Sequence, residues 1–356
     1  MSRAKDALLI SLTISMGIGV GVISMELLVR GLRGEMFSRP AEAQTRLELH
    51  ESSYPTRHDP LLGYVPTPGA MRKWPSGAAL TITPAGLRSN GQRHPSAGRL
   101  VLAVGDSFTF GDEVDDRDTW PAHLERILER PVLNGGVFGY GFDQIVLRAE
   151  RLLERFPARV LIVSLIPDDV TRCEYPYRYA WKPYFEIIRG SLELRNLPVP
   201  DPESAPPPRT ALGRLSRFSH LADVVLRNLD PTAWRIGGVR RAHRRGPEVA
   251  GLLVDRMAKL RAERDLTILL MLQWQPGLPD RAAQPVLSRA HQLGIEVLIV
   301  EPFVREAIEN DDAALPRFYT AVAGRAEFAA NHMNGAGNQL IAELVADKLS
   351  EMEAAR

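Results

Sequence analysis

A serine and a histidine far apart in the chain are the residues best suited to chemistry. Ser107 ends the turn Gly105-Asp106-Ser107, directly after the apolar run 100–104. A serine just beyond the carboxyl end of a buried strand can present its hydroxyl to a crevice while the backbone amides around it stay free. His332 precedes the last helical pattern, and a neutral histidine can accept the proton of such a serine. The pair predicts nucleophilic catalysis with Ser107 as nucleophile and His332 as base.

Two further residues follow predicted strands. Gly139 comes after the second strand and Asp168 after the third. Loops at one edge of a parallel sheet converge even when they are far apart in sequence. The amides of Ser107 and Gly139 can then point at a developing oxyanion, where one donor is worth about 3 kcal/mol. The plainer alternatives are that Gly139 serves a tight turn and that His332 packs against or caps a helix.

The elements that must position these residues alternate between strand and helix. Helices are predicted from a cap at Thr119, from a cap at Asp143, over 280–293 and over 337–352. The apolar runs that predict buried strands are 100–104, 131–134, 159–166, 266–272 and 295–300. Five such strands alternating with helices predict a parallel, doubly wound α/β sheet.

The N-terminus predicts a membrane anchor over residues 1–33. Residues 7–25 carry no charge, and 19 helical residues reach about 28 Å, close to the hydrocarbon thickness of a bilayer. A cleaved signal peptide and a buried core helix are the alternatives. Glu26 and Arg30 follow directly without a small-x-small cleavage site, which favours an uncleaved single-pass anchor.

Neither the orientation nor the packing of this anchor follows clearly from the sequence. Arginines and a lysine flank the span on both sides, and this distribution does not favour an exported C-terminus. Long domains translocate regardless of flanking charge, and we expect the C-terminal domain outside the cytoplasm. Gly17 and Gly21 would allow a close helix-helix approach, so a homodimer through the span is a weaker prediction.

Three segments follow the anchor in the predicted domain organisation. Residues 34–98, rich in Pro, Gly, Arg and Ser, predict a linker and a small lead-in of hairpins. Residues 99–356 form the α/β domain, interrupted by an insertion at 170–247. Because the insertion follows the third strand, it could cap the crevice of the sheet. The alternative, which the sequence supports equally, is that the insertion is solvated and does not contact the ligand.

Composition limits the kinds of partner that we expect the protein to bind. Lys and Arg number 44 against 43 for Asp and Glu, so the charge gives no reason to expect nucleic acid. One cysteine and eight scattered histidines leave no recognisable metal framework. We therefore predict no metal site.

The site blocks together resemble the SGNH (GDSL-type) hydrolases. Gly105-Asp106-Ser107-Phe108 resembles the block of the family's serine, the stretch 134–139 that of its glycine, and 332–337 that of its histidine. The resemblance implies a flavodoxin-like three-layer fold and an acyl-serine intermediate without a cofactor. It places Gly139 and Asp168 at the oxyanion hole beside the catalytic Ser107 and His332.

Two departures from the family pattern stand out. Asp168 occupies the usual position of an oxyanion asparagine, and an ionised carboxylate aimed at an oxyanion would repel it. The acid expected three residues before the histidine is replaced by Ala329. Glu327 and Asn331 are candidates to orient His332 instead, and a Ser-His dyad is the alternative.

The sequence thus predicts a serine esterase or acyl hydrolase, or an acyltransferase, acting on O-acyl esters. A membrane anchor beside such a domain points to acylated carbohydrate or lipid of the cell envelope. The main alternative is a catalytically degenerate domain that binds a glycan or a protein partner. A nucleotide-binding loop at residues 136–141 is a weaker one, because the glycine spacing differs from the usual pattern and no Walker lysine follows.

Overall fold

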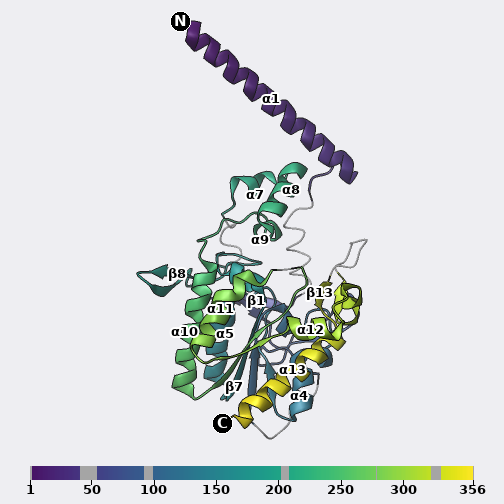
Figure 1. Ribbon diagram of the computed structural model, residues 1–356, viewed down its shortest axis with the longest axis vertical. Coiled ribbons are helices and arrows are strands. Elements are labelled where there is room, and N and C mark those ends of the chain that lie inside the picture. The colour runs from purple at the N-terminus through teal and green to yellow at the C-terminus, as the bar shows by residue number, and fades with distance from the viewer. Residues whose placement is uncertain are drawn as a thin grey trace. The chain divides into compact units, whose positions relative to one another are not determined.

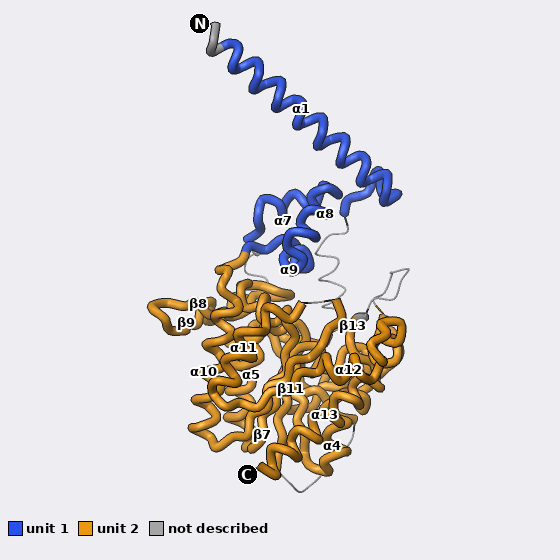
Figure 2. The backbone as a smooth tube through the Cα atoms, viewed as in Figure 1, with its two compact units in different colours: residues 1–50, 207–240 blue, residues 51–206, 241–356 orange. Residues whose placement is uncertain are grey.

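The computed structural model describes residues 2–40, 54–91, 99–201, 208–277, 279–321 and 330–355. The chain divides into two compact units (Figure 2). Residues 1–50 and 207–240 form the anchor unit, and residues 51–206 and 241–356 form the sheet unit.

A five-stranded parallel sheet lies at the centre of the sheet unit. In spatial order its strands are β6 (Val132–Asn134), β5 (Val101–Val104), β7 (Val160–Leu165), β10 (Thr267–Leu272) and β11 (Glu296–Ile299). Numbered along the chain, this is the flavodoxin-like order 2-1-3-4-5. The predicted doubly wound fold is therefore confirmed, and its switch point lies between β5 and β7, where ligands of such sheets bind.

Helices cover both faces of this sheet (Figure 1). The helices α5 (Phe142–Arg155), α10 (Gly246–Arg264) and α11 (Gln284–Gln292) pack on one face, and α4 (Trp120–Leu128), α12 (Glu301–Ala307) and α13 (Gly335–Ala354) on the other. Side chains of β5 alternate between the two cores, with Leu102 in one and Ala103 in the other. Burial on both faces explains why these strands are almost continuously apolar.

Helix starts agree with the sequence at one predicted cap and differ at another. Thr119 caps α4 as predicted, because its Oγ1 accepts a hydrogen bond from the amide of Ala122 at 3.3 Å. The prediction that Asp143 caps α5 is wrong, since Gly141 is the N-cap residue. Asp143 lies inside the first turn, where its Oδ2 is 2.6 Å from Nζ of the buried Lys182. The carboxylate thus pairs with Lys182 through one oxygen, while its Oδ1 accepts a hydrogen bond from the amide of Gln144 at 2.8 Å.

Two other predicted helices have slightly different bounds. The helix expected over 280–293 consists of a 3₁₀ turn, η2 (Asp280–Ala283), followed by α11, with Pro285 in the first turn of α11. Proline suits that position because it lacks the amide hydrogen that an interior helical residue must donate. The closing helix α13 begins two residues before the predicted start, with Asn334 as its N-cap.

The lead-in before the sheet contains two antiparallel hairpins. They pair β1 (Thr56–Asp59) with β2 (Gly63–Pro66), and β3 (Met71–Lys73) with β4 (Ala79–Thr81). Leu62, Tyr64 and Leu80 are buried in the same core as α5. This segment is therefore part of the hydrophobic core of the sheet unit, as well as a connection.

The insertion after β7 is divided between the two units. Its first part holds α6 (Pro167–Arg172) and the hairpin of β8 (Tyr184–Ile188) with β9 (Ser191–Arg195), all in the sheet unit. The stretch 207–240 groups instead with the N-terminal helix, and it contains α7 (Ala211–Leu215), α8 (His220–Leu229) and α9 (Pro231–Arg235). A cap role for the insertion remains a proposal.

The N-terminal helix α1 spans Ser2–Arg33. Residues 5–33 are long and apolar enough to cross a membrane, and none of this apolar stretch is buried within the structure. This finding rests on length and composition, and a signal sequence near the N-terminus would meet the same criteria. Gly17 and Gly21 have no atom within 4 Å of an added Cβ, so the homodimer through this helix stays a prediction.

Candidate active site

Ser107 stands at the junction of strand and helix. It is the first residue of the short helix α3 (Ser107–Phe110), three residues after β5 ends. The N-cap residue Asp106 accepts a hydrogen bond from the amide of Phe108 at 3.0 Å. Glycine is required at 105, because a Cβ there would lie 2.2 Å from Oγ1 of Thr109. This sharp turn places the Ser107 hydroxyl at the carboxyl edge of the sheet beside the switch point.

His332 reaches Ser107 from the other end of the sequence. It lies on β13 (Ala330–Met333), which pairs with β12 (Tyr319–Ala321) in a small antiparallel ribbon before α13. Its Nε2 is 2.9 Å from Oγ of Ser107, which is hydrogen-bond distance. The ring also lies 5.2 Å from the Phe108 ring, centroid to centroid. The structure therefore brings together the two residues predicted to act as nucleophile and base.

Glu113 is a carboxylate of the site that the sequence did not predict. Its Oε1 lies 3.9 Å from Nδ1 of His332. Asn331 donates a hydrogen bond to that oxygen at 2.7 Å, and Thr320 donates to the other oxygen at 2.5 Å. Glu113 adopts a left-handed conformation with φ of 70°, which is uncommon for a residue with a side chain. These contacts hold the carboxylate on the Nδ1 side of the histidine.

The two predicted candidates to orient His332 have different outcomes. Asn331 contacts Glu113, so its amide acts on the carboxylate instead of on the imidazole. Glu327 and Ala329 lie outside the described residues. No motif signals Glu113, because it belongs to the irregular turn after the serine block and not to the histidine block. Its proximity to Ser107 in sequence was the available signal.

Asp112 is a second acidic neighbour of the imidazole. Its Oδ2 lies 3.6 Å from Nε2 of His332, and it accepts a hydrogen bond from the hydroxyl of Tyr54. Burial raises the pKa of Asp112 to about 7. Burial alone would lower the pKa of His332, but Asp112 and Glu113 favour the imidazolium and raise that pKa overall. The two carboxylates thus favour the protonated form of the His332 imidazole.

Gly139 lies in the turn between β6 and α5. Its φ is 67°, and an added Cβ would lie 2.2 Å from Cε2 of Tyr179. Backbone conformation and contact therefore both require glycine at this position. Within the described part of the chain, the amides of Ser107 and Gly139 donate to no other protein group. Both remain free to donate to a ligand.

Asp168 is paired with two arginines. It lies in the first turn of α6, and its Oδ2 accepts a hydrogen bond from Nε of Arg172 at 3.0 Å. Nη2 of Arg178 lies 3.5 Å from the same oxygen. Both guanidinium groups are almost fully buried. The negative charge that replaces the family's asparagine is therefore compensated by neighbouring positive charge.

Arg172 connects this carboxylate to the serine turn. Its Nη1 lies 3.3 Å from Oδ2 of Asp106 and 2.5 Å from Oδ1 of Asp169. Oδ2 of Asp106 is in turn 3.4 Å from Oγ of Ser107. Burial opposes the charge of Arg172, but the surrounding carboxylates raise its pKa overall. The buried guanidinium of Arg172 thus forms ion pairs with both the serine turn at 105–108 and the segment at 166–169.

Comparisons with known proteins identify similar folds. No family model and no curated protein matches the chain. Its fold is similar to that of GDSL-type esterases. A protein described as lipolytic and of the G-D-S-L family from Desulfitobacterium hafniense is 14% identical, with 70% of this chain and 99% of that chain covered at a TM-score of 0.40. The acetylxylan esterase Axe2 from Geobacillus stearothermophilus is 12% identical, with 72% and 96% covered at 0.42.

A third similar structure is the esterase EstA from a Pseudoalteromonas species. It is 10% identical, with 72% of this chain and all of that chain covered at a TM-score of 0.40. The strand order β6-β5-β7-β10-β11 of this chain, and not these matches, confirms the predicted flavodoxin-like fold. The roles of Ser107, His332, Gly139 and Asp168 rest on the geometry of this chain.

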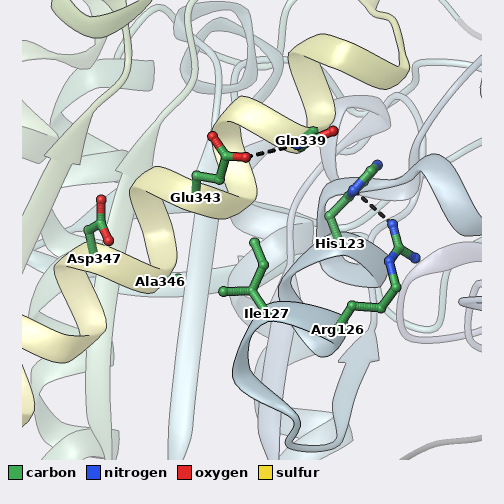
Figure 3. Close-up of a pocket in the computed structure, with 7 residues that line it drawn as sticks. All are labelled: His123, Arg126, Ile127, Gln339, Glu343, Ala346 and Asp347. Carbon is green, nitrogen blue, oxygen red and sulfur yellow. Dashed lines mark hydrogen bonds between the residues drawn. The ribbon is translucent and has the colours of Figure 1, made fainter.

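A separate pocket of about 570 Å³ lies between α4 and α13 (Figure 3). It is lined by His123, Arg126, Ile127, Gln339, Glu343, Ala346 and Asp347. The imidazole Nδ1 of His123 is 2.7 Å from Nη2 of Arg126. None of the predicted site residues lines this pocket, so it is distinct from the candidate active site.

Proposed function

We propose that the sheet unit is a serine esterase or acyl hydrolase, or an acyltransferase, acting on O-acyl esters. The single observation that carries the proposal is the 2.9 Å distance between Oγ of Ser107 and Nε2 of His332. The two side chains come from opposite ends of the domain and meet at the switch point of the sheet. A nucleophile within hydrogen-bond distance of its base is the arrangement that acyl transfer requires.

The first half of the reaction forms the acyl-enzyme. Oγ of Ser107 attacks the acyl carbonyl while Nε2 of His332 takes the hydroxyl proton, giving a tetrahedral oxyanion. The amides of Ser107 and Gly139 donate to that oxyanion, and each such donor is worth about 3 kcal/mol. When the intermediate collapses, the imidazolium returns its proton to the departing alkoxide. The alcohol leaves, and the acyl group stays on Ser107.

The second half regenerates the serine. Water or a sugar hydroxyl gives its proton to His332 and attacks the acyl carbonyl, and the acyl-oxygen bond to Ser107 then breaks. Ser107 recovers its proton from the imidazolium, and the product is a free acid or a new ester. Glu113 and Asp112 stabilise the imidazolium in both halves, which is the role that an acidic residue has in a catalytic triad.

Asp168 is proposed as part of the oxyanion side of the site, with its charge compensated by Arg172 and Arg178. An unpaired carboxylate there would repel the tetrahedral oxyanion. The arginine pairs at 3.0 and 3.5 Å reduce that repulsion. The proposed oxyanion donors are therefore the backbone amides of Ser107 and Gly139, and the role of Asp168 is to place Arg172 and Arg178.

The proposed substrates are acylated carbohydrates or lipids of the cell envelope. The support is the long apolar helix α1, which would keep the sheet unit close to a membrane as a single-pass protein. We propose that the sheet unit faces outside the cytoplasm, where such esters are found.

The test uses full-length protein in detergent and p-nitrophenyl esters of increasing acyl length. Wild type is expected to release p-nitrophenol, whereas Ser107→Ala and His332→Ala fall to the background rate. Ser350→Ala, on the exposed side of α13, is the matched control and should keep full activity. A fluorophosphonate probe should label wild type at Ser107, as located by peptide mass spectrometry. Equal rates for all variants together with no labelling would refute the proposal and favour a binding domain.

A further inference from the structure

The end of the apolar helix α1 is bonded to the start of α8. Glu26 is the first charged residue after the uncharged stretch 7–25. Its carboxylate accepts hydrogen bonds from the hydroxyl of Ser219 at 2.7 Å and from the amides of His220 and Leu221 at 3.0 and 2.8 Å. Amides at a helix start lack partners within their own helix. Glu26 therefore supplies a cap for α8 from a distant part of the sequence.

Two arginines on the last turns of α1 strengthen this connection. Arg30 donates to the carbonyl of Phe218 at 3.0 Å, and also forms an ion pair with Glu26 at 2.6 Å. Arg33 lies 3.3 Å from Asp223, inside α8. Three residues of α1, each about one turn from the next, thus contact the first turn of α8 and the two residues that precede it. The helical module, residues 208–240, is fixed to the end of α1 within the anchor unit.

These bonds determine the depth of the module if α1 crosses a bilayer. An uncharged stretch of 19 residues covers about 28 Å, so its end at Met25 marks the boundary of the hydrocarbon region. Glu26 comes directly after this boundary. The residues that it contacts, 219–221, must then lie at the level of the lipid headgroups.

Exposed apolar side chains lie at this end of the anchor unit. Phe37 is fully exposed, and Leu215 and Phe218 keep more than half of their surface accessible. The guanidinium of Arg39 lies 5.3 Å from the ring centroid of Phe218. Helices that lie on a membrane surface typically place Phe and Leu in the apolar boundary and keep their arginines with the headgroups.

The charge of the module suits an anionic surface. Within 207–240 the chain carries six arginines, Arg209, Arg214, Arg217, Arg227, Arg235 and Arg240, against the two acidic residues Asp223 and Asp230. Asp223 is already paired with Arg33. Each basic residue near an anionic leaflet contributes about 1 kcal/mol to attraction. Lipid phosphates are the complementary partner at this depth.

We propose that the helical module, residues 208–240, is a membrane-surface contact that lies on the bilayer crossed by α1. Phe37 and Phe218 enter the interface, and the arginines bind the phosphates of anionic phospholipids. Removal of α1 as a signal peptide would leave the amides of His220 and Leu221 without their acceptor Glu26, so the proposal takes α1 to be part of the mature protein. The proposal does not depend on the esterase activity.

The test places a fluorescent label on Phe218→Cys in the full-length protein. The only natural cysteine, Cys173, is buried and is replaced by Ala in every variant. The protein is inserted into nanodiscs of phosphatidylcholine with or without phosphatidylglycerol, and quenching by headgroup-proximal doxyl lipids is measured. We expect clear quenching at position 218, stronger with phosphatidylglycerol. A label on Leu12→Cys, inside α1, reports insertion of the span.

Two further variants separate the parts of the proposal. Glu26→Gln combined with Ser219→Ala should reduce quenching at 218 while leaving the label at 12 unchanged. Arg214→Gln with Arg227→Gln, both exposed positions, should abolish the extra quenching by phosphatidylglycerol. An unquenched label at 218 beside a quenched label at 12 would overturn the proposal. An unquenched label at 12 would overturn it too, because the span itself would be missing.

Discussion

Oε1 of Glu113 lies 3.9 Å from Nδ1 of His332, on the side of the imidazole away from the atom that faces Ser107. The imidazole of His332 thus lies between the Ser107 hydroxyl and the Glu113 carboxylate, as in the arrangement of a catalytic triad. Glu113 follows Ser107 by only a few residues in the sequence. The distance is longer than a hydrogen bond. Catalytic hydrogen bonds are often long in ligand-free enzymes and tighten when substrate binds.

Glu113→Gln tests whether this carboxylate orients His332. The substitution keeps the size of the side chain but removes the charge that stabilises the imidazolium. We expect kcat to fall roughly 10²-fold with little change in KM, because general acid-base catalysis contributes about 10²- to 10⁴-fold. Steady-state hydrolysis of p-nitrophenyl acetate measures the effect. Glu309→Gln, at an exposed position, is the control, and an equal rate for both variants would exclude the triad role.

Asp112 makes the pH dependence of the reaction a second test. His332 must be neutral to act as a base, so its raised pKa places the acidic limb of kcat/KM above the usual histidine range. Asp112, with a pKa of about 7, titrates in the same range. The acidic limb of the profile therefore reflects the coupled titration of Asp112 and His332. Asp112→Asn removes a charge that favours the imidazolium, so the histidine stays neutral at lower pH.

The expected result for Asp112→Asn is an acidic limb shifted to lower pH, because a charge that favours the imidazolium is lost. The profile is measured as kcat/KM against pH, with wild type and Asp255→Asn compared in the same buffers. Asp255 pairs with Arg289 on the surface of α10, so its substitution should leave the limb unchanged. A limb that moves upward, or does not move, contradicts the proposed electrostatics.

The convergence of Ser107 and His332 was predictable from the sequence because it follows from topology. Buried strands alternate with helices, and the ends of parallel strands share one edge of the sheet. The position of Glu113 was not predictable, because it depends on a left-handed residue in an irregular turn and on hydrogen bonds from Thr320 and Asn331. Such contacts leave no periodic signal along the chain.

Long-range pairs in the insertion were beyond sequence reasoning for the same reason. Asp168 departs from the family pattern, but its compensation by Arg178 requires the fold of a segment that lacks apolar periodicity. Likewise, Asp143 is a residue type that often caps helices, yet here its carboxylate forms an ion pair with Lys182. The union of the helical module with α1 depends on Glu26 meeting residues almost two hundred positions later.

Arg172 is predicted to be essential for stability. It is the shared partner of Asp106, Asp168 and Asp169, and removing one member of a buried ion pair costs about 3–5 kcal/mol. Arg172→Met should lower the free energy of unfolding by that amount in urea titrations of the full-length protein in detergent. Arg172→Lys retains the charge but loses the forked geometry, and should fall between wild type and Arg172→Met.

The matched control for that series is Arg256→Met. Arg256 pairs with Glu150 at 2.5 Å, but both side chains are partly exposed, and exposed pairs contribute about 0–1 kcal/mol. Its unfolding free energy should therefore stay close to that of wild type. If Arg172→Met were as stable as Arg256→Met, the buried cluster could not be what holds the serine turn to α6.

Gly139→Ala tests whether this glycine positions an oxyanion donor or serves only a turn. Alanine keeps the amide, but its Cβ would lie 2.2 Å from Cε2 of Tyr179 at a φ of 67°. The turn must therefore shift, and we expect kcat to fall roughly 10²-fold as the amide leaves the oxyanion. Gly190→Ala is the control, because its φ of 80° is similar but no atom lies within 4 Å of the added Cβ.

Tyr179→Ala combined with Gly139→Ala separates contact from backbone strain. The double variant removes the clash with Tyr179. It leaves the left-handed conformation, which costs alanine about 1–2 kcal/mol, and a close approach of 3.1 Å to the Tyr64 hydroxyl. If the displaced amide causes the catalytic loss, kcat should recover in the double variant while the unfolding free energy stays lowered, as in Gly190→Ala. A Gly139→Ala protein that loses stability but keeps the kcat of wild type would restrict Gly139 to the turn and leave the amide of Ser107 as the remaining donor.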